Sequence, residues 1–177
     1  MDKELIKGLI AEYQQFVKSV SFVKRAVTLS DNFNYVFVGL RRVGKSYLMY
    51  QQIHHLIETG ISPEEILFFN FEDERIAGMD TEHLDMIKRC YEEMYSHRPI
   101  FFLDEIQIVP HWEQFVRRLA DQKYRVYVTG SNAKMLSKDI ATTLGGRFMI
   151  QYVYPFSFRE YLSSNGVQLD KLWIYKN

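Results

Sequence analysis

The sequence predicts an α/β fold with three layers, in which helices cover both faces of a mainly parallel, five-stranded sheet. The first observation is a set of short apolar runs at residues 35–38, 66–71 and 100–103. Strands that are buried on both faces of a parallel sheet have this composition. The second observation is that segments with helical spacing of apolar residues separate these runs. Such an alternation is typical of parallel strands joined by helical crossovers.

Two further strands, at residues 124–130 and 148–154, complete the expected sheet. The segment between them, residues 132–144, is polar but compatible with a helix, and Gly145-Gly146-Arg147 ends it. The first helical pattern has an apolar stripe, so we expect it to pack on the sheet or on a partner domain. The expected helices cover residues 2–29, 47–59, 80–97, a stretch that begins at Pro110, and 157–162.

Length and composition set the broad class. The chain has 177 residues, enough for one domain with its own core, and 47% of them are apolar. Basic and acidic residues both number 22, so the net charge of zero gives no global case for a nucleic-acid partner or an anionic membrane. The single cysteine, Cys90, excludes an intrachain disulfide and favours a reducing compartment. Neither a signal peptide nor a membrane-spanning run is found, so we expect a cytoplasmic protein.

The chain is organised around residues 34–46, NYVFVGLRRVGKS. This stretch fits the P-loop (Walker A) pattern G-x-x-x-x-G-K-[ST], with an expected strand before it and a helix after it. Backbone N–H groups can surround phosphates only where no Cβ intervenes, and Gly39 and Gly44 allow that approach. The helix directs its positive dipole end at the phosphates, Lys45 adds a mobile charge, and the Ser46 hydroxyl can ligate Mg²⁺. The residues expected to contact nucleotide are Gly39, Arg41, Arg42, Val43, Gly44, Lys45, Ser46 and Tyr47.

Two carboxylates follow the apolar run at residues 100–103, which gives the Walker B pattern FFLDE. Asp104, at the tip of the strand, would hold Mg²⁺ directly or through water. Glu105 could accept a hydrogen bond from an attacking water and act as a general base. Because parallel strands end at the same edge of a sheet, we expect both carboxylates to lie beside the P-loop.

Three more polar residues are candidates for the same chemistry. Ser131 and Asn132 follow the strand at residues 124–130. Side chains there can contact the γ-phosphate or the attacking water, and they can also cap the next helix. Arg147 could stabilise transition-state charge in its own subunit or in a neighbouring one, and an ordinary exposed arginine is the alternative.

Together these motifs carry a resemblance. The segments GLRRVGKSYLMYQ, NFEDER, FFLDEIQIVPHWE, VTGSNAKMLS, TLGGRF and YPFSFREYL resemble the prokaryotic AAA+-type P-loop ATPases classed as AAA-14. The resemblance implies a three-layer P-loop NTPase fold in which the sensor strand, here residues 124–130, lies between the P-loop strand and the Walker B strand. It also implies a sensor position at Ser131 and Asn132 and a Gly-Arg motif at Arg147.

The apolar patterns and the resemblance together predict how the chain is divided. Residues 1–30 would be an N-terminal helical segment packed on the core, and residues 31–162 the P-loop ATPase core. Residues 163–177 would begin a C-terminal region that is truncated here, because members of the family usually join this core to a C-terminal domain of unknown function.

The expected function is Mg²⁺-dependent binding of ATP followed by its hydrolysis. A homo-oligomer and an unknown protein partner or C-terminal domain are the expected partners, and no membrane is expected. One alternative is a nucleotide-dependent switch that controls a protein or DNA partner with little turnover. Another is a small-molecule kinase, for which the sequence shows no recognisable acceptor pocket. A nucleic-acid role through basic residues such as Arg41 and Arg42 also stays open.

Overall fold

The computed structural model describes residues 2–131 and 142–167 of the chain. In this part five strands form one sheet in the order β2-β3-β4-β1-β5. Every pairing between neighbouring strands is parallel, so the mainly parallel sheet expected from the sequence is in fact all parallel. The strands are β1 (Asn34–Gly39), β2 (Ile66–Asn70), β3 (Ile100–Asp104), β4 (Val126–Ser131) and β5 (Phe148–Tyr152).

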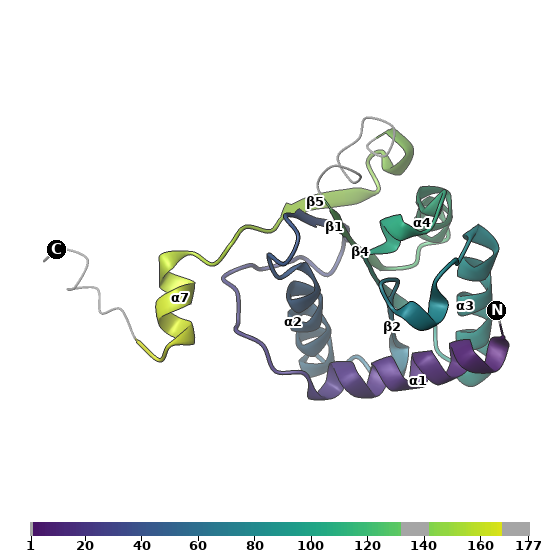
Figure 1. Cartoon of the computed structure of the whole chain (residues 1–177), viewed down its shortest axis with the longest axis horizontal. Helices are drawn as coiled ribbons and strands as arrows, with labels where there is room; N and C mark the ends of the chain where they lie inside the picture. The colour runs from purple at the N-terminus through teal and green to yellow at the C-terminus, as the bar shows by residue number, and fades with distance from the viewer. Residues whose placement is uncertain (1, 132–141, 168–177) are drawn as a thin grey trace, which may run out of the picture.

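Helices cover both faces of the sheet, which gives the three expected layers (Figure 1). The helix α2 lies on one side, α3 and α4 lie on the other, and α1 runs along the end of the sheet at β2. Short 3₁₀ turns, η1 (Pro63–Glu65), η2 (Glu74–Ile76) and η3 (Ile106–Ile108), flank β2 and follow β3. The helices are α1 (Lys3–Ser19), α2 (Lys45–Glu58), α3 (Thr81–Met94), α4 (Trp112–Asp121) and α7 (Phe158–Ser164).

The strand order places β4 between the P-loop strand and the Walker B strand, as expected. Gly39 at the end of β1 pairs with Ser131, and Leu103 near the end of β3 pairs with Val128. The three strands therefore deliver their carboxyl ends to one edge of the sheet. Aromatic rings tie the same strands together, since the Tyr127 ring stacks on Phe102 with centroids 4.4 Å apart.

The N-terminal helix is shorter than the sequence predicted. The apolar pattern indicated a helix over residues 2–29, but α1 ends at Ser19 and Val20 is already extended, with ψ of 130°. Residues 20–29 are rich in valine, which favours extended backbone. The Gln51 amide of α2 stabilises that form, because it accepts from the Arg25 N–H at 2.6 Å and donates to the Arg25 carbonyl at 3.1 Å.

Other boundaries differ by a few residues. The helix expected to reach position 97 ends at Met94, and β4 and β5 are shorter than the strands expected at 124–130 and 148–154. Most of the segment 132–144 lies outside the described residues. Among the residues that are described, none of the helices is both long and apolar enough to cross a membrane.

Candidate functional site

The loop between β1 and α2 has the backbone that an anion site needs. Gly44, with φ of 97°, is the N-terminal cap of α2, and no side chain hydrogen-bonds to the free N–H groups there in the described chain. Gly39 is required for a different reason: a Cβ at this position would lie 2.4 Å from the Val153 carbonyl oxygen. Both glycines of the motif are therefore dictated by the local geometry, one by its left-handed φ and one by close packing.

Lys45 points inward from the start of α2. Its side chain is only 4% exposed, and its ammonium lies 3.3 Å from Glu105 Oε1. It also donates a hydrogen bond to the Leu40 carbonyl at 3.2 Å. The lysine is thus held within the loop, with a carboxylate as its counter-charge.

Asp104 lies at the end of β3 and is almost completely buried. Thr129 Oγ1 donates a hydrogen bond of 2.5 Å to Asp104 Oδ1. Burial raises the pKa of Asp104 to about 6, although the hydroxyls of Thr129 and Ser46 oppose the shift by favouring the ionised carboxyl. The Ser46 hydroxyl at the start of α2 and the Asp104 carboxyl at the end of β3 therefore lie at the same edge of the sheet. These are oxygen ligands of the kind that Mg²⁺ prefers, and Mg²⁺ needs only one or two of them from the protein.

Glu105 follows directly and is held at three points. Its backbone is left-handed, with φ of 54°. Its N–H donates to Thr129 Oγ1 at 2.8 Å. One carboxylate oxygen, Oε1, faces Lys45, and the other accepts a hydrogen bond of 2.5 Å from the Gln107 amide.

Thr129 is a site residue that the sequence reasoning missed. It is fully buried and is hydrogen-bonded to the carboxylate of Asp104 and to the backbone N–H of Glu105. The sequence pointed instead to Ser131 and Asn132, two and three residues later. The sequence did contain one indication of this role, because Thr129 is a single hydroxyl-bearing threonine in the otherwise apolar strand VYVTG. Its meaning depends on the register, because pairing of Leu103 with Val128 sets Thr129 beside Asp104.

The structure brings most of the predicted residues together at one edge of the sheet. The backbone of Ser131 reaches this edge opposite Gly39, while Asn132 lies outside the described residues. Within the loop, Arg41 is 82% exposed and pairs with Glu72 at 3.6 Å. The residues that meet are Gly39, Val43, Gly44, Lys45, Ser46, Asp104 and Glu105, with Arg42 and Tyr47 on the exposed side of the loop.

Arg147 lies elsewhere. It precedes β5, and its carbonyl accepts a hydrogen bond from Asn34 at the beginning of β1, so it sits at the sheet edge opposite the P-loop. Its guanidinium binds Asp121 of α4 at 2.6 Å. In a single chain Arg147 therefore does not join the other candidates.

A cavity of about 720 Å³ adjoins the loop. Its walls are mainly apolar, and they come from three separate parts of the chain: the extended segment after α1, the P-loop and the stretch after β5. No sequence motif indicated this cavity. Its lining includes Phe22, Val23, Leu40, Tyr47 and Phe156.

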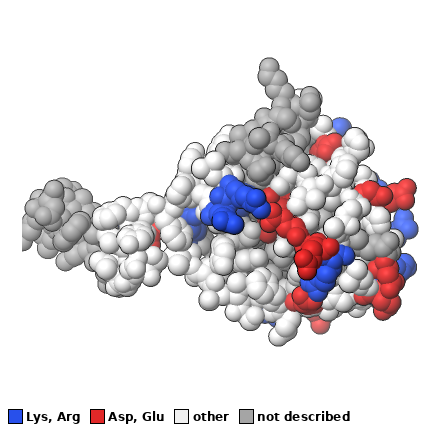
Figure 2. Space-filling model, viewed as in Figure 1, with Lys and Arg blue, Asp and Glu red and all other residues white. Residues whose placement is uncertain are grey.

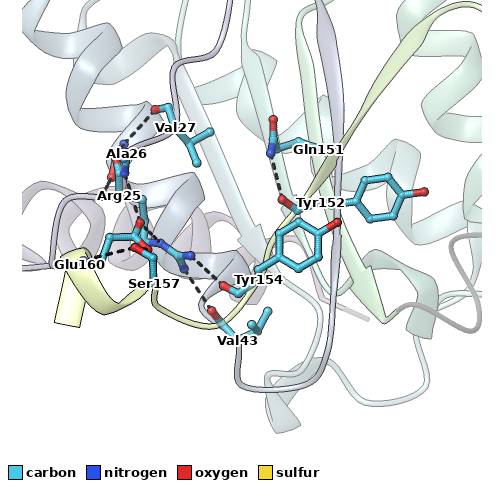
Figure 3. Close-up of polar contacts among 10 residues, drawn as sticks. Arg25, Ala26, Val27, Val43, Gln151, Tyr152, Tyr154, Ser157 and Glu160 are labelled. Atoms are coloured by element: carbon cyan, nitrogen blue, oxygen red, sulfur yellow. Dashed lines mark hydrogen bonds and ion pairs between the residues drawn. The ribbon is translucent and has the colours of Figure 1, made fainter. Parts of the chain in front are cut away.

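The same three parts of the chain meet at Arg25 (Figure 3). The Arg25 side chain is 8% exposed, and its Nε donates to Glu160 of α7 at 2.9 Å. Its other nitrogens donate to the carbonyls of Tyr154, at 2.7 Å, and of Val43, at 3.4 Å. Burial opposes ionisation of Glu160, but hydrogen bonds from Ser157, Arg25 and Ala26 lower its pKa to about 2. A buried ion pair thus joins α7 to the P-loop backbone.

Acidic and basic side chains alternate on the face shown in Figure 2. Blue and red groups lie side by side there, in keeping with the Arg41–Glu72 pair and with the bidentate pair between Arg75 and Glu12.

The fold and sequence have relatives among known proteins. A family model described as an AAA domain, AAA_14, matches residues 31–162. An uncharacterized protein of Methanocaldococcus jannaschii is 32% identical over 171 residues, which cover 96% of this chain and 37% of that protein. Another from Haemophilus influenzae is 35% identical over 162 residues, covering 86% of this chain and 40% of that protein. The chain therefore spans less than half the length of either relative.

Among solved structures, the Saccharomyces cerevisiae Hsp104–ADP complex has a similar fold. It superposes with a TM-score of 0.55 at 15% identity, over 94% of this chain and 26% of that one. At this level of identity the likeness concerns the fold alone.

Proposed function

The chain belongs to the AAA_14 family of AAA domains, and on that premise we propose that it binds ATP together with Mg²⁺ and hydrolyses the γ-phosphate. The observation that carries the proposal is the convergence of Lys45 and Ser46 with Asp104 and Glu105 at one edge of the sheet. A phosphate-binding loop, a metal-binding carboxyl and a base within one small volume are the parts that phosphoryl transfer to water requires.

In this proposal the free N–H groups at the start of α2 and the Lys45 ammonium hold the phosphates. Lys45 would exchange its present partner, Glu105, for phosphate oxygens. Ser46 and Asp104 would hold Mg²⁺, which supplies charge neutralisation to the phosphate oxygens when it is bound. Release from Lys45 leaves Glu105 Oε1 free to accept the proton of an attacking water.

The apolar cavity beside the loop suits the nucleoside. It opens next to Val43 and Gly44, and its walls carry the aromatic rings of Phe22, Tyr47 and Phe156. Flat apolar walls favour stacking of a base, and adjacency to the loop would keep base and phosphates in one ligand.

Arg147 is proposed to act between subunits. Because it lies at the edge of the sheet away from its own P-loop, it could stabilise charge only at the site of a neighbouring copy. That role requires a homo-oligomer. Ser131 and Asn132 are proposed to act as the sensor, in contact with the γ-phosphate or the attacking water. The protein is proposed to be cytoplasmic.

A nucleotide-dependent switch is the second candidate, and one observation favours it. Arg25 joins the P-loop carbonyl of Val43 to Glu160 of α7, so a change in the loop has a direct route to the C-terminal part of the chain. A switch would bind ATP through the same residues and turn it over slowly.

The test pairs isothermal titration of a non-hydrolysable ATP analogue and Mg²⁺ with phosphate release from ATP. Lys45→Ala should abolish binding. Glu105→Gln should keep binding and lower turnover by roughly 10²–10⁴-fold, the usual contribution of a general base. Unchanged hydrolysis in Glu105→Gln would remove Glu105 as the base, and binding without turnover in the wild type would favour the switch.

A further inference from the structure

We propose that Gln107 is a positioning residue that orients Glu105 for the attack of water. This inference rests on the proposed function. It concerns a side chain in η3, beyond the Walker B pair, that takes no part in binding phosphate or metal in the proposal above. Its amide nitrogen donates to Glu105 Oε2 at 2.5 Å.

The orientation of the amide follows from its partner. An ionised carboxylate has only acceptor atoms, so the Gln107 NH₂ group, and not its oxygen, must face Glu105. The oxygen, Oε1, is then buried, and it has no hydrogen-bond partner among the residues that the structure describes. A buried unpaired acceptor lowers folding stability, so this amide is poorly explained as a contribution to the fold.

The backbone of the turn brings the two side chains together. Glu105 adopts its left-handed φ while its N–H is fixed by Thr129, and Ile106, fully buried, anchors the start of η3. The Glu105 carbonyl then accepts from the Ile108 N–H at 3.2 Å, which closes the turn. Gln107, two residues after Glu105, is thereby directed back at the carboxylate.

The two oxygens of Glu105 consequently have different partners. Oε1 faces Lys45, at 3.3 Å, and Oε2 faces Gln107. If Lys45 moves to the phosphates, Gln107 is the side-chain partner that remains among the residues that the structure describes. It would keep the carboxylate from rotating and would leave Oε1 directed toward the site that Lys45 vacates.

That oxygen would receive the proton in the proposed reaction. The water oxygen forms a bond to the γ-phosphorus, the bond from this phosphorus to the β–γ bridging oxygen breaks, and Glu105 takes the proton of the water. ADP and inorganic phosphate leave. Gln107 forms and breaks no bond in this step and affects only the direction of Glu105.

The experiment compares Gln107→Met with the wild type, using phosphate release for kcat and KM, and titration of a non-hydrolysable analogue for Kd. Methionine keeps the volume of glutamine and removes both amide groups. We expect kcat to fall by about 10- to 100-fold, part of the roughly 10²–10⁴ that a placed base contributes. KM and Kd should stay within about twofold of the wild-type values, because Gln107 does not contact the bound nucleotide in this proposal.

Two controls separate positioning from folding. Gln15→Met alters an exposed glutamine of α1 and should leave kcat, KM and Kd at wild-type values. The melting temperature of Gln107→Met should be unchanged or higher, since the unpaired oxygen is gone.

Wild-type kcat in Gln107→Met would overturn the inference. So would a loss of kcat that is accompanied by an equal loss of affinity or by a lower melting temperature, since that pattern indicates a structural role. A wild-type protein without any turnover is a different failure: it removes the hydrolysis proposal itself, and the role of Gln107 with it.

Discussion

A single buried hydroxyl, that of Thr129, connects the side chain of Asp104 to the backbone of Glu105. Thr129 Oγ1 donates to Asp104 Oδ1 and accepts the N–H of Glu105, so one atom fixes both the side chain of the first and the backbone of the second. Because Thr129 belongs to β4, the relative placement of Asp104 and Glu105 depends on the neighbouring strand as well as on their own.

Valine has the shape of threonine but lacks its hydroxyl, so it tests the role of this group. Thr129→Val leaves the Glu105 N–H and one Asp104 oxygen without their partner inside the fold. We expect the free energy of unfolding in urea to fall by about 1–3 kcal/mol, the cost of buried groups left unpaired. Thr129→Ser, which keeps the hydroxyl, is the control and should recover most of this loss. Equal stability of the valine and serine variants would contradict the assignment.

The placement of individual residues could be predicted from the sequence where it follows from a local motif. Lys45, Ser46, Asp104 and Glu105 converge because strand ends share an edge and the spacing of each motif is local. Three contacts could not be foreseen, because each depends on residues distant in the chain or on a turn: Arg25 with Glu160, Thr129 with Asp104, and the Gln107 amide with Glu105.

The end of β1 packs closely against the chain that follows β5. The chain continues past β5 as Val153, whose N–H donates to the Val38 carbonyl at 2.8 Å and whose own carbonyl lies against Gly39. The end of β1 is thus enclosed by backbone, which cannot move aside as a side chain can.

Gly39→Ala should therefore destabilise the fold. The added Cβ would meet the Val153 carbonyl at 2.4 Å and Val43 Cγ1 at 2.8 Å. We expect a loss of about 1–3 kcal/mol in urea unfolding, the usual cost of overpacking. Gly8→Ala is a matched control, since a Cβ at Gly8 on α1 meets nothing within 4 Å. It should stabilise by about 0.5–1 kcal/mol through helix propensity. Opposite signs for the two variants are the decisive result.

The elements themselves were predicted unevenly. All five strands were found, because continuous apolar runs between helical segments leave few alternatives. The prediction for α1 was wrong at its C-terminal end, because the helix was predicted to reach residue 29 and ends at Ser19. The competing factor was tertiary: the Gln51 amide offers the extended segment hydrogen bonds that a helix would otherwise make within itself.

The Arg25–Glu160 pair joins distant parts of the molecule, because it links the extended segment after α1 to α7 beside the P-loop. Both side chains are about one-tenth exposed, at 8% and 11%, so solvent screens them little. Removal of one partner from a buried ion pair is strongly destabilising, because the other charge stays buried without a counter-charge. Replacement of both partners by apolar residues costs much less.

Glu160→Gln should lower the free energy of unfolding by about 3–5 kcal/mol at pH 7, because Arg25 is left buried without a counter-charge. The pH dependence should also change. The pKa of Glu160 is lowered from 4.5 to about 2 in the folded chain, so its contribution is complete above pH 4.5 and is lost as the pH falls toward 2. Urea unfolding between pH 7 and pH 3 should show a shallower acid loss in the variant. If the free energy of unfolding falls equally with pH in the wild type and in Glu160→Gln, the ion pair is not the source of the acid loss.

The order of strands in the sheet has a consequence for synthesis of the protein. The P-loop strand β1 pairs with β4 and β5, and the Asn34 side chain accepts from the Val126 N–H, 92 residues later. At about 5–20 residues per second, a ribosome would leave this apolar strand without its neighbours for on the order of 5–20 s. During that interval β2 and β3, which pair with each other, can form first. The nascent chain should thus be most open to chaperones at the very segment that later receives the nucleotide.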